Sequence, residues 1–148
     1  MRALLQRATR AAVRVRGEEV AVIGPGLVIL LGVGPGDDDS DARGLAAKIA
    51  NLRIFRDDAG LTNRSLLDIG GSALVVSQFT LFADTRKGRR PSFLGAAPPP
   101  IAEARYETFA RALESLGVPV GRGRFGEEME VELVNDGPMT VWLDTAEG

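Results

Sequence analysis

The fold is decided by the stretch Gly24-Pro25-Gly26-Leu27-Val28-Ile29-Leu30-Leu31-Gly32-Val33-Gly34-Pro35-Gly36. Its middle part, Leu27–Val33, is continuously apolar, which is typical of a strand covered on both faces. The Gly-Pro pairs on either side favour turns, so they indicate where the strand begins and where it ends. A second apolar, β-branched run, Ala73–Phe82, predicts another buried strand, so the sequence indicates a strand-rich core.

Shorter strands are expected on both sides of these two runs. Apolar and polar residues alternate over Ala11–Val15, and after a Gly-Glu turn signal Val20–Ile23 can return as a second strand. Towards the C-terminus, the alternation over Met129–Leu133 predicts a strand with one acidic, solvent-facing side. The run Met139–Leu143 is expected to be the last strand.

Two helices complete the expected architecture. An acidic cluster, Asp37, Asp38, Asp39 and Asp41, could bind a cation. It is better interpreted as the capped N-terminus of a helix whose buried stripe is Leu45, Ile49 and Leu52. Apolar residues at helical spacing over Ile101–Leu116 predict the second helix. The fold class is therefore α+β, with strand-rich mixed sheet layers and about two helices in a single domain, residues 1–148.

The composition excludes several kinds of chemistry. The 148 residues include no Cys and no His. Disulfides, thiolate or imidazole zinc sites and Ser-His-Asp triads are therefore impossible. An enzyme with this composition must use carboxylates, hydroxyls, Lys or Arg, backbone groups, or the substrate itself. No metal or other cofactor is expected.

The charge and hydropathy of the chain bear on its location and partners. The net charge is −2, so the chain as a whole is not a strongly basic nucleic-acid binder, although a local basic patch remains possible. No apolar run approaches the roughly 20 residues of a membrane helix. The basic N-terminus lacks the apolar core of a secretory signal. We therefore expect a cytoplasmic protein with no membrane partner.

Three segments could carry chemistry, and the first is Ser77-Gln78-Phe79-Thr80. Polar side chains occur here at the end of an apolar strand, where unpaired polar groups cost about 1–3 kcal/mol each. A site is one interpretation. The other interpretation is that these side chains form hydrogen bonds to local backbone groups where the strand ends. The residues alone favour neither interpretation.

The second segment is Asn135-Asp136-Gly137-Pro138-Met139-Thr140. On spacing alone it is a hairpin turn, because Asn, Asp and Gly are the residues that turns favour. A Gly-Pro bond also has an appreciable chance of being cis, which would turn two neighbouring carbonyl groups the same way. From the residues alone, the hairpin turn is the favoured interpretation.

The third segment is the basic loop, Thr85–Pro91, which contains four cations: Arg86, Lys87, Arg89 and Arg90. Cationic side chains on a loop suit a phosphate backbone. A solvated loop that offsets the acidic strands is an equally good interpretation.

Taken in order, these segments resemble the D-aminoacyl-tRNA deacylases of the small bacterial and eukaryotic type. The resemblance runs nearly end to end. It rests on Met1-Arg2-Ala3 with Gln6-Arg7, Gly24–Leu27, Lys48–Phe55, Ser77–Leu81, Ala83–Phe93, Gly123–Gly126 and Asn135–Thr140. Glu127-Glu128 stands where the family commonly has Ala-Asp, and the Pro98-Pro99-Pro100 loop is unusually rich in proline.

The resemblance implies a D-aminoacyl-tRNA deacylase-like fold, a homodimer and an active site at the dimer interface. It implies that Ser77, Gln78, Phe79 and Thr80 line the pocket for the terminal adenosine and its aminoacyl group. It further implies that Gly137 and Pro138 form a Gly-cisPro motif, so we predict that the bond between them is cis. This motif, fixed by Arg7 and flanked by Asn135, Met139 and Thr140, would reach into the partner's pocket and exclude L side chains. The substrate would be the D-aminoacyl ester of tRNA, with mischarged glycine as a further substrate.

The implied mechanism needs no histidine. It is substrate-assisted, with the ribose 2′-hydroxyl taking part. Thr80 is the alternative nucleophile, but it has no evident base to activate it, so we predict that no side chain attacks the ester. Backbone N–H groups near Phe79 and Thr80 are expected to stabilise the oxyanion. The basic loop would contact tRNA, and no DNA partner is expected. Two other function classes compete with this one: a non-catalytic RNA-binding module that uses the basic loop, and a metal-dependent hydrolase that uses Asp37, Asp38 and Asp39.

Overall fold

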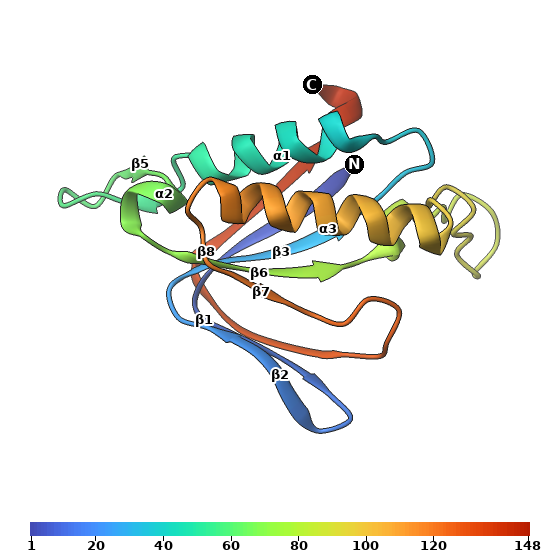
Figure 1. Cartoon of the computed structure of the whole chain (residues 1–148), viewed down its shortest axis with the longest axis horizontal. Coiled ribbons are helices and arrows are strands. Elements are labelled where there is room, and N and C mark those ends of the chain that lie inside the picture. Colours follow the sequence, from blue (N-terminus) through green and yellow to red (C-terminus); the bar gives the residue numbers. More distant parts are fainter.

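The computed structural model describes all 148 residues and is built on one mixed, curved sheet (Figure 1). The sheet consists of β1 (Arg2–Val15), β2 (Glu18–Ile23), β3 (Gly26–Gly32), β6 (Ser72–Ser77), β7 (Val120–Arg122) and β8 (Glu130–Asp144). The long strand β1 is antiparallel to β8 on one side and to β2 and β3 on the other, whereas β3–β6 and β6–β7 are parallel pairs. A separate ribbon is formed by β4 (Phe55–Arg56) and β5 (Thr62–Arg64).

Two long helices, α1 (Asp39–Asn51) and α3 (Pro99–Ser115), lie next to each other over one face of the sheet (Figure 1). Both were predicted. A third helix, α2 (Leu66–Ile69), is a single turn that the sequence analysis missed, although its Ser65–Asp68 capping box was readable. Two short 3₁₀ helices, η1 (Phe79–Phe82) and η2 (Thr145–Glu147), complete the chain. None of the helices has the length and apolar character needed to cross a membrane.

Strand β3 is buried on both faces, as its sequence predicted. Leu27, Ile29 and Leu31 belong to the main core between the sheet and the helices. Val28 faces the opposite way, into a smaller core with Leu74 of β6 and with residues of β1 and β2. The sheet can cover its own second face because the β1–β2 hairpin and β8 bend away from the helices and fold towards it (Figure 1).

Strand β6 is shorter than the sequence predicted. Its pairing with β3 ends at Ser77, which lies opposite Leu31, and the next N–H, that of Gln78, donates to the Leu31 carbonyl at 2.8 Å. Because β3 itself ends at Gly32, a longer β6 would have no partner on that side. The predicted strand residues Phe79–Phe82 form the 3₁₀ helix η1 instead.

Strands β1 and β8 are longer than predicted, and the hairpin-turn interpretation of Asn135–Pro138 is wrong. Strand β1 begins at Arg2, so the predicted Ala11–Val15 is only its second half. Strand β8 pairs with β1 both before and after the supposed turn: Ala8 lies opposite Asn135, and Gln6 lies opposite Thr140. The four residues Asp136–Met139 loop out opposite a single residue of β1, and we call them the Gly-Pro bulge.

Candidate functional site

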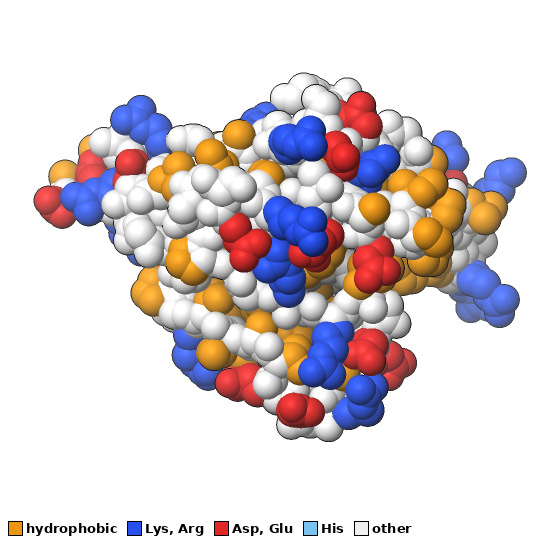
Figure 2. Space-filling view, in the orientation of Figure 1, with side chains coloured by type: hydrophobic (Ala, Val, Ile, Leu, Met, Phe, Trp, Pro, Cys, Tyr) orange, Lys and Arg blue, Asp and Glu red, His pale blue; other side chains and the backbone are white.

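A cavity of about 470 Å³ opens at the end of the sheet where β6 gives way to η1. Its lining is mainly apolar and comes from β3, the strand end, the loop before α3, α3 itself and the segment after β7. The lining includes Ser77, Gln78, Phe79, Phe93, Ala96, Tyr106 and Phe125. We call it the apolar cavity. Figure 2 shows hydrophobic side chains gathered at this end of the molecule. A volume in this range is that of a small-molecule site.

Three of the four residues predicted for the pocket, Ser77, Gln78 and Phe79, line the apolar cavity. Phe79 is 55% exposed and meets the Phe93 ring edge-on, with centroids 5.1 Å apart. Thr80 lies one residue further along η1, and its hydroxyl accepts a hydrogen bond from the Gln78 amide. The backbone N–H groups of Phe79 and Thr80 donate to no other group of the chain, as the first N–H groups of a 3₁₀ turn do.

Tyr106 forms part of the cavity wall, and the sequence analysis did not single it out. It is buried on α3, and its hydroxyl donates to the Val75 carbonyl at 2.7 Å. Burial raises the pKa of Tyr106 to about 12, so the phenol stays neutral at physiological pH. The Phe125 ring lies 6.1 Å from it, centroid to centroid. Among core residues at helical spacing, a wall tyrosine carries no sequence signal of its own.

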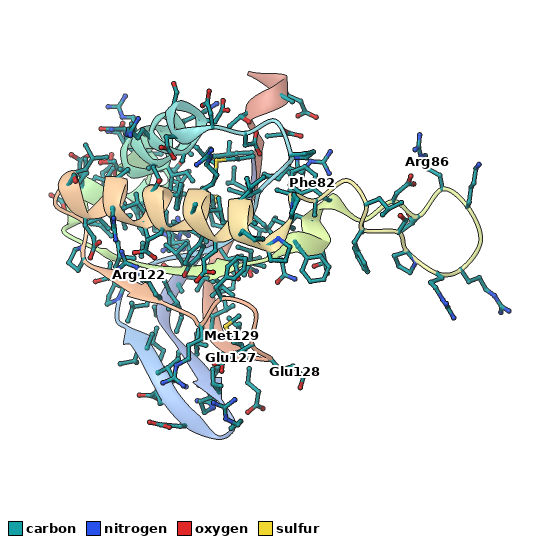
Figure 3. All side chains as sticks on the ribbon, turned by 45° about the vertical axis from the view of Figure 1, so that its right-hand side comes forward. Phe82, Arg86, Arg122, Glu127, Glu128 and Met129 are labelled. Atoms are coloured by element: carbon teal, nitrogen blue, oxygen red, sulfur yellow. The ribbon has the colours of Figure 1, made fainter.

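A second cavity, of about 330 Å³, lies on the other side of the same strand end. It shares Ser77, Gln78 and Phe79 with the apolar cavity, but its far wall includes Glu127 and Glu128 (Figure 3). Glu127 is paired with Arg16 at 3.4 Å, whereas Glu128 is exposed and makes no ion pair. Both acids therefore line a wall close to the predicted pocket.

The Gly-Pro bulge is held from inside the sheet by Arg7, which is only 3% exposed. The Arg7 Nε donates to the Asp136 carbonyl at 3.0 Å, and Nη1 donates to the Ile54 carbonyl at 2.7 Å. The Asn135 side-chain amide closes the bulge by donating to the carbonyls of Arg7, at 2.9 Å, and Met139, at 3.0 Å. Arg7 and Asn135 therefore both contact the backbone of the bulge or of the residues beside it.

The bulge itself is exposed at Gly137 and Pro138, and the peptide bond between them is cis, as predicted. Arg56 makes two hydrogen bonds to the Asp136 carboxylate, at 3.1 and 3.0 Å. Thr140, where regular pairing resumes, accepts a hydrogen bond from Gln6 at 3.4 Å. An exposed tip on a buried anchor is suited to contact another molecule.

Within one chain, the bulge and the apolar cavity lie far apart. The bulge is opposite Arg7, whose partner on β3 is Leu27, whereas Ser77 is the partner of Leu31. Four residues along a strand span about 13 Å, and three steps between neighbouring strands add about 14 Å sideways, so roughly 20 Å of sheet separates them. No residue of the bulge lines the apolar cavity.

The basic loop extends from the body of the molecule beyond Phe82 (Figure 3). Its base is fixed by a bridge between Asp84 and Ser92, with N–O distances of 2.8 and 2.9 Å. Arg86 is bound to the Asp84 carboxylate at 2.9 and 2.8 Å. Hydrogen bonds from the Arg86 side chain and backbone lower the pKa of Asp84 to about 2. Lys87, Arg89 and Arg90 make no ion pair and are the free cations of the loop.

The acidic cluster is a helix cap, which confirms that interpretation. Asp38 is the N-cap of α1 and forms a capping box with Asp41. Asp37 accepts a hydrogen bond from the Gly34 N–H at 2.6 Å, and Asp39 binds Arg105 at 3.1 Å. Each carboxylate therefore has its own partner. No group of three acidic side chains in the chain is arranged to hold a metal ion.

The chain is similar to known proteins over nearly its whole length. Residues 4–144 match the family model described as D-Tyr-tRNA(Tyr) deacylase. A D-aminoacyl-tRNA deacylase of Thermomicrobium roseum is 62% identical over 147 residues, covering 99% of this chain and 96% of that protein. A D-aminoacyl-tRNA deacylase of Deinococcus radiodurans is 59% identical over 144 residues, covering 97% of this chain and 99% of that protein.

Two solved structures share the fold. One, a c-Myc DNA unwinding element binding protein, has a TM-score of 0.92 and 39% identity, over 98% of this chain and 99% of that chain. The other, a probable eukaryotic D-amino acid tRNA deacylase, has a TM-score of 0.84 over 96% of this chain and 97% of that chain, with 19% identity. On the family match and the relatives together, this chain belongs to the D-Tyr-tRNA(Tyr) deacylase family of hydrolases.

Proposed function

We propose that two copies of this chain combine an apolar cavity from one with a Gly-Pro bulge from the other to hydrolyse D-aminoacyl-tRNA. Deacylation of aminoacyl-tRNA is the activity of the family to which the chain belongs. The observation that carries the composite site is the roughly 20 Å of sheet between the two segments within one chain. A symmetric dimer can bring the bulge of each copy to the cavity of the other, which makes two equivalent sites.

The apolar cavity is the site for the terminal adenosine. Its walls are aromatic and aliphatic, and Phe79 and Phe93 present ring surfaces at its mouth, on which a base can stack. Ser77 and Gln78 bring polar groups to the same wall. The scissile ester, which follows the ribose, then lies near the strand end and the start of η1.

The chemistry needs no side-chain nucleophile. Water adds to the ester carbonyl, the bond to the ribose oxygen breaks, and the proton ends on that oxygen; the neighbouring 2′-hydroxyl assists the transfer from within the substrate. The free N–H groups of Phe79 and Thr80 are placed to stabilise the oxyanion, a contribution worth about 10²–10³ in rate per donor in known cases.

Thr80 lacks a base that could activate it. Its hydroxyl is bound to the Gln78 amide, which cannot accept its proton. Asp84, the nearest carboxylate in the sequence, is bound to Arg86, and its pKa of about 2 makes it a poor base. The chain contains no histidine. No metal or other cofactor is part of the proposed mechanism.

The site distinguishes D-aminoacyl from L-aminoacyl esters by steric exclusion. Gly137 and Pro138 of one copy, held by Arg7 and Asn135, occupy the space that an L side chain would need in the other copy's site. Met139 and Thr140 support the motif where β8 resumes. Because exclusion acts on the side chain, glycine, which has none, should be accepted, and we include mischarged glycyl-tRNA among the substrates.

The rest of the tRNA is attracted by the basic loop. Lys87, Arg89 and Arg90 are free to contact phosphates, whereas Arg86 supports the loop through Asp84. We place the enzyme in the cytoplasm, where aminoacyl-tRNA is used, and propose neither a membrane nor a DNA partner. The DNA-binding name of the structural relative is the reason to include DNA in the test.

The test is deacylation of matched D-Tyr-tRNA, L-Tyr-tRNA and Gly-tRNA by the purified protein, with and without excess duplex DNA. We expect rapid release of D-tyrosine and glycine, no comparable action on L-Tyr-tRNA, and no inhibition by DNA beyond that of an equally charged polyanion. Equal rates on the two tyrosine enantiomers would reject the proposal. A non-catalytic RNA-binding module would bind all three tRNAs and release nothing.

A further inference from the structure

The 3₁₀ helix η1 is fixed at both ends, and the second anchor has no part in the function proposed above. At its start, the Gln78 N–H donates to the Leu31 carbonyl of β3 at 2.8 Å. At its end, Arg2 of β1 donates through Nη1 to the Leu81 carbonyl at 2.9 Å. The N–H groups of Phe79 and Thr80, the proposed oxyanion donors, lie between these two anchors.

Arg2 is itself held in a defined position. Its Nε donates to the Asp144 carboxylate of β8 at 3.1 Å, and the Asp144 side chain is only 9% exposed. The guanidinium carbon lies 4.4 Å from the centroid of the Phe82 ring and 5.8 Å from that of the Trp142 ring. A planar guanidinium can make a directed hydrogen bond to a carboxylate and stack on an aromatic ring at once, which a lysine ammonium cannot do.

Phe82, the last residue of η1, is confined from the side of β3 as well. A Cβ atom added to Gly32 would lie 3.1 Å from the Phe82 ring, and one added to Gly34 would lie 3.2 Å from it. The ring therefore packs directly on the glycine backbone of the β3 end while Arg2 lies over it. Figure 3 shows Phe82 at the point where the chain leaves the body for the basic loop.

We infer that Arg2 is a positioning residue of the active site: by binding Leu81, Phe82 and Asp144 together, it fixes the orientation of η1 and so of the free N–H groups of Phe79 and Thr80. Arg2 does not line the apolar cavity. It acts by orienting these two N–H donors, which contribute most in the transition state, when negative charge develops on the ester oxygen. This inference rests on the proposed role of those N–H groups.

The kinetic test compares Arg2→Ala with the matched control Arg14→Ala. Arg14 is also on β1, is similarly exposed, and also pairs with β8, through Glu132 at 2.6 Å, but it lies far from η1. Arg2→Ala should lower kcat on D-Tyr-tRNA by about tenfold or more with little change in KM, because the lost interaction belongs to the transition state. Arg14→Ala should leave both constants within about twofold of the wild type.

Two further variants separate positioning from folding. Arg2→Lys keeps a cation beside Asp144 but not the combined contacts to Leu81 and Phe82, so it should recover only part of kcat. Gly34→Ala leaves Arg2 intact and pushes on the Phe82 ring, so it should also lower kcat. If Arg2→Ala lowers only the melting temperature and leaves kcat at the wild-type value, the residue is merely structural and the inference is wrong.

An assay-free readout keeps the inference distinct from the proposed function. Backbone amide chemical shifts of Phe79 and Thr80 should move in Arg2→Ala and stay in place in Arg14→Ala. Unmoved shifts in Arg2→Ala overturn the inference whatever the activity. If the wild type hydrolyses no D-aminoacyl-tRNA while the shifts move as expected, it is the proposed function that fails, and Arg2 still positions η1.

Discussion

The Arg7 guanidinium occupies the space in which a side chain at residue 137 would begin. A Cβ atom built on Gly137 would lie 2.6 Å from Arg7 Nη2, and Gly137 has a φ of +129°, which L side chains rarely adopt. Arg7 is buried and bound to two carbonyl groups, so it cannot move aside cheaply. Only glycine fits at the tip of the Gly-Pro bulge.

The first prediction follows from this contact. Gly137→Ala should displace the bulge, lower D-Tyr-tRNA deacylation by about 100-fold or more and cost about 1–3 kcal/mol in stability. The matched control is Gly44→Ala: Gly44 lies mid-helix in α1 with nothing within 4 Å of an added Cβ. The control should keep full activity and gain up to about 1 kcal/mol in the free energy of unfolding. Wild-type activity in Gly137→Ala would contradict the proposed role of the bulge.

The second prediction concerns the anchor itself. Arg7→Lys cannot make the contacts to both Asp136 and Ile54, so part-buried carbonyl groups lose partners, at a cost of up to about 1–3 kcal/mol. Deacylation should fall by at least about tenfold as the bulge loosens. Arg56→Lys, at an exposed contact to the same Asp136, should change both quantities little. Thermal unfolding and single-turnover deacylation measure the two effects, and equal behaviour of the two variants would count against the anchor.

The third prediction separates the cations of the basic loop. Replacing Lys87, Arg89 and Arg90 with Ala should weaken tRNA binding and reduce its salt dependence, by about 0.9 in the log–log slope per lost phosphate contact. Hydrolysis of a short D-aminoacyl-adenosine should be spared. Equal damage to both substrates would instead make the loop part of the catalytic site.

Arg86→Ala should not reduce the salt dependence of tRNA binding in the way that the other three substitutions do, because Arg86 is already paired with Asp84. The lowered pKa of Asp84 means that this contact is fully present above the ordinary carboxyl pKa and is lost only as pH falls towards about 2. Affinity for tRNA between pH 5 and 8 should therefore show no step from this pair. A titration of tRNA affinity against pH at constant ionic strength checks it.

The fourth prediction is that Thr80 is not the nucleophile. Thr80→Val keeps the shape of the residue but removes its hydroxyl, and it should lose far less than the 10²–10³ in rate that a lost oxyanion donor costs. A substrate charged stably at the 3′ position but lacking the terminal 2′-hydroxyl should scarcely turn over. Mass spectrometry of quenched reactions tests the alternative directly: an acyl group trapped on Thr80 would overturn the mechanism and leave the deacylase assignment intact.

The sequence predicted best those features that local periodicity determines. The apolar run Leu27–Val33 did form a strand buried on both faces, and both long helices lie where their spacing placed them. The polar side chains from Ser77 on indicated that the strand ends nearby, but they did not give the exact position, which is set by the end of the neighbouring β3. The bulge was hidden for the same reason: Asp136 and Arg7 are 129 residues apart in the chain, and only their pairing shows that β8 continues.

For the candidate site, the sequence identified most of the residues but few of their roles. Ser77, Gln78 and Phe79 do meet at one cavity, and Arg7 and Asn135 do hold the bulge. Tyr106 was missed because a wall residue on an amphipathic helix resembles an ordinary core residue. The difference between Arg86 and the other loop cations was readable in principle, since its partner Asp84 is only two residues away.

The composite site makes a quantitative prediction for mixed dimers. Ala96→Trp should fill the apolar cavity from its loop, and Gly137→Ala should spoil the bulge, so each variant alone should be inactive. In a dimer of one copy of each, the open cavity of the Gly137→Ala copy meets the intact bulge of the Ala96→Trp copy. One of the two sites is then complete.

The most direct measurement is therefore D-Tyr-tRNA deacylation by an equal mixture of the two variants after their subunits have been exchanged. Random pairing makes half of the dimers mixed, each with one complete site, so activity should return to about one quarter of the wild-type value. As a control, a chain carrying both substitutions, mixed equally with the wild type, should reduce activity to about one quarter rather than one half. Failure of the two inactive variants to restore any activity, with mixed dimers present, would contradict the shared site.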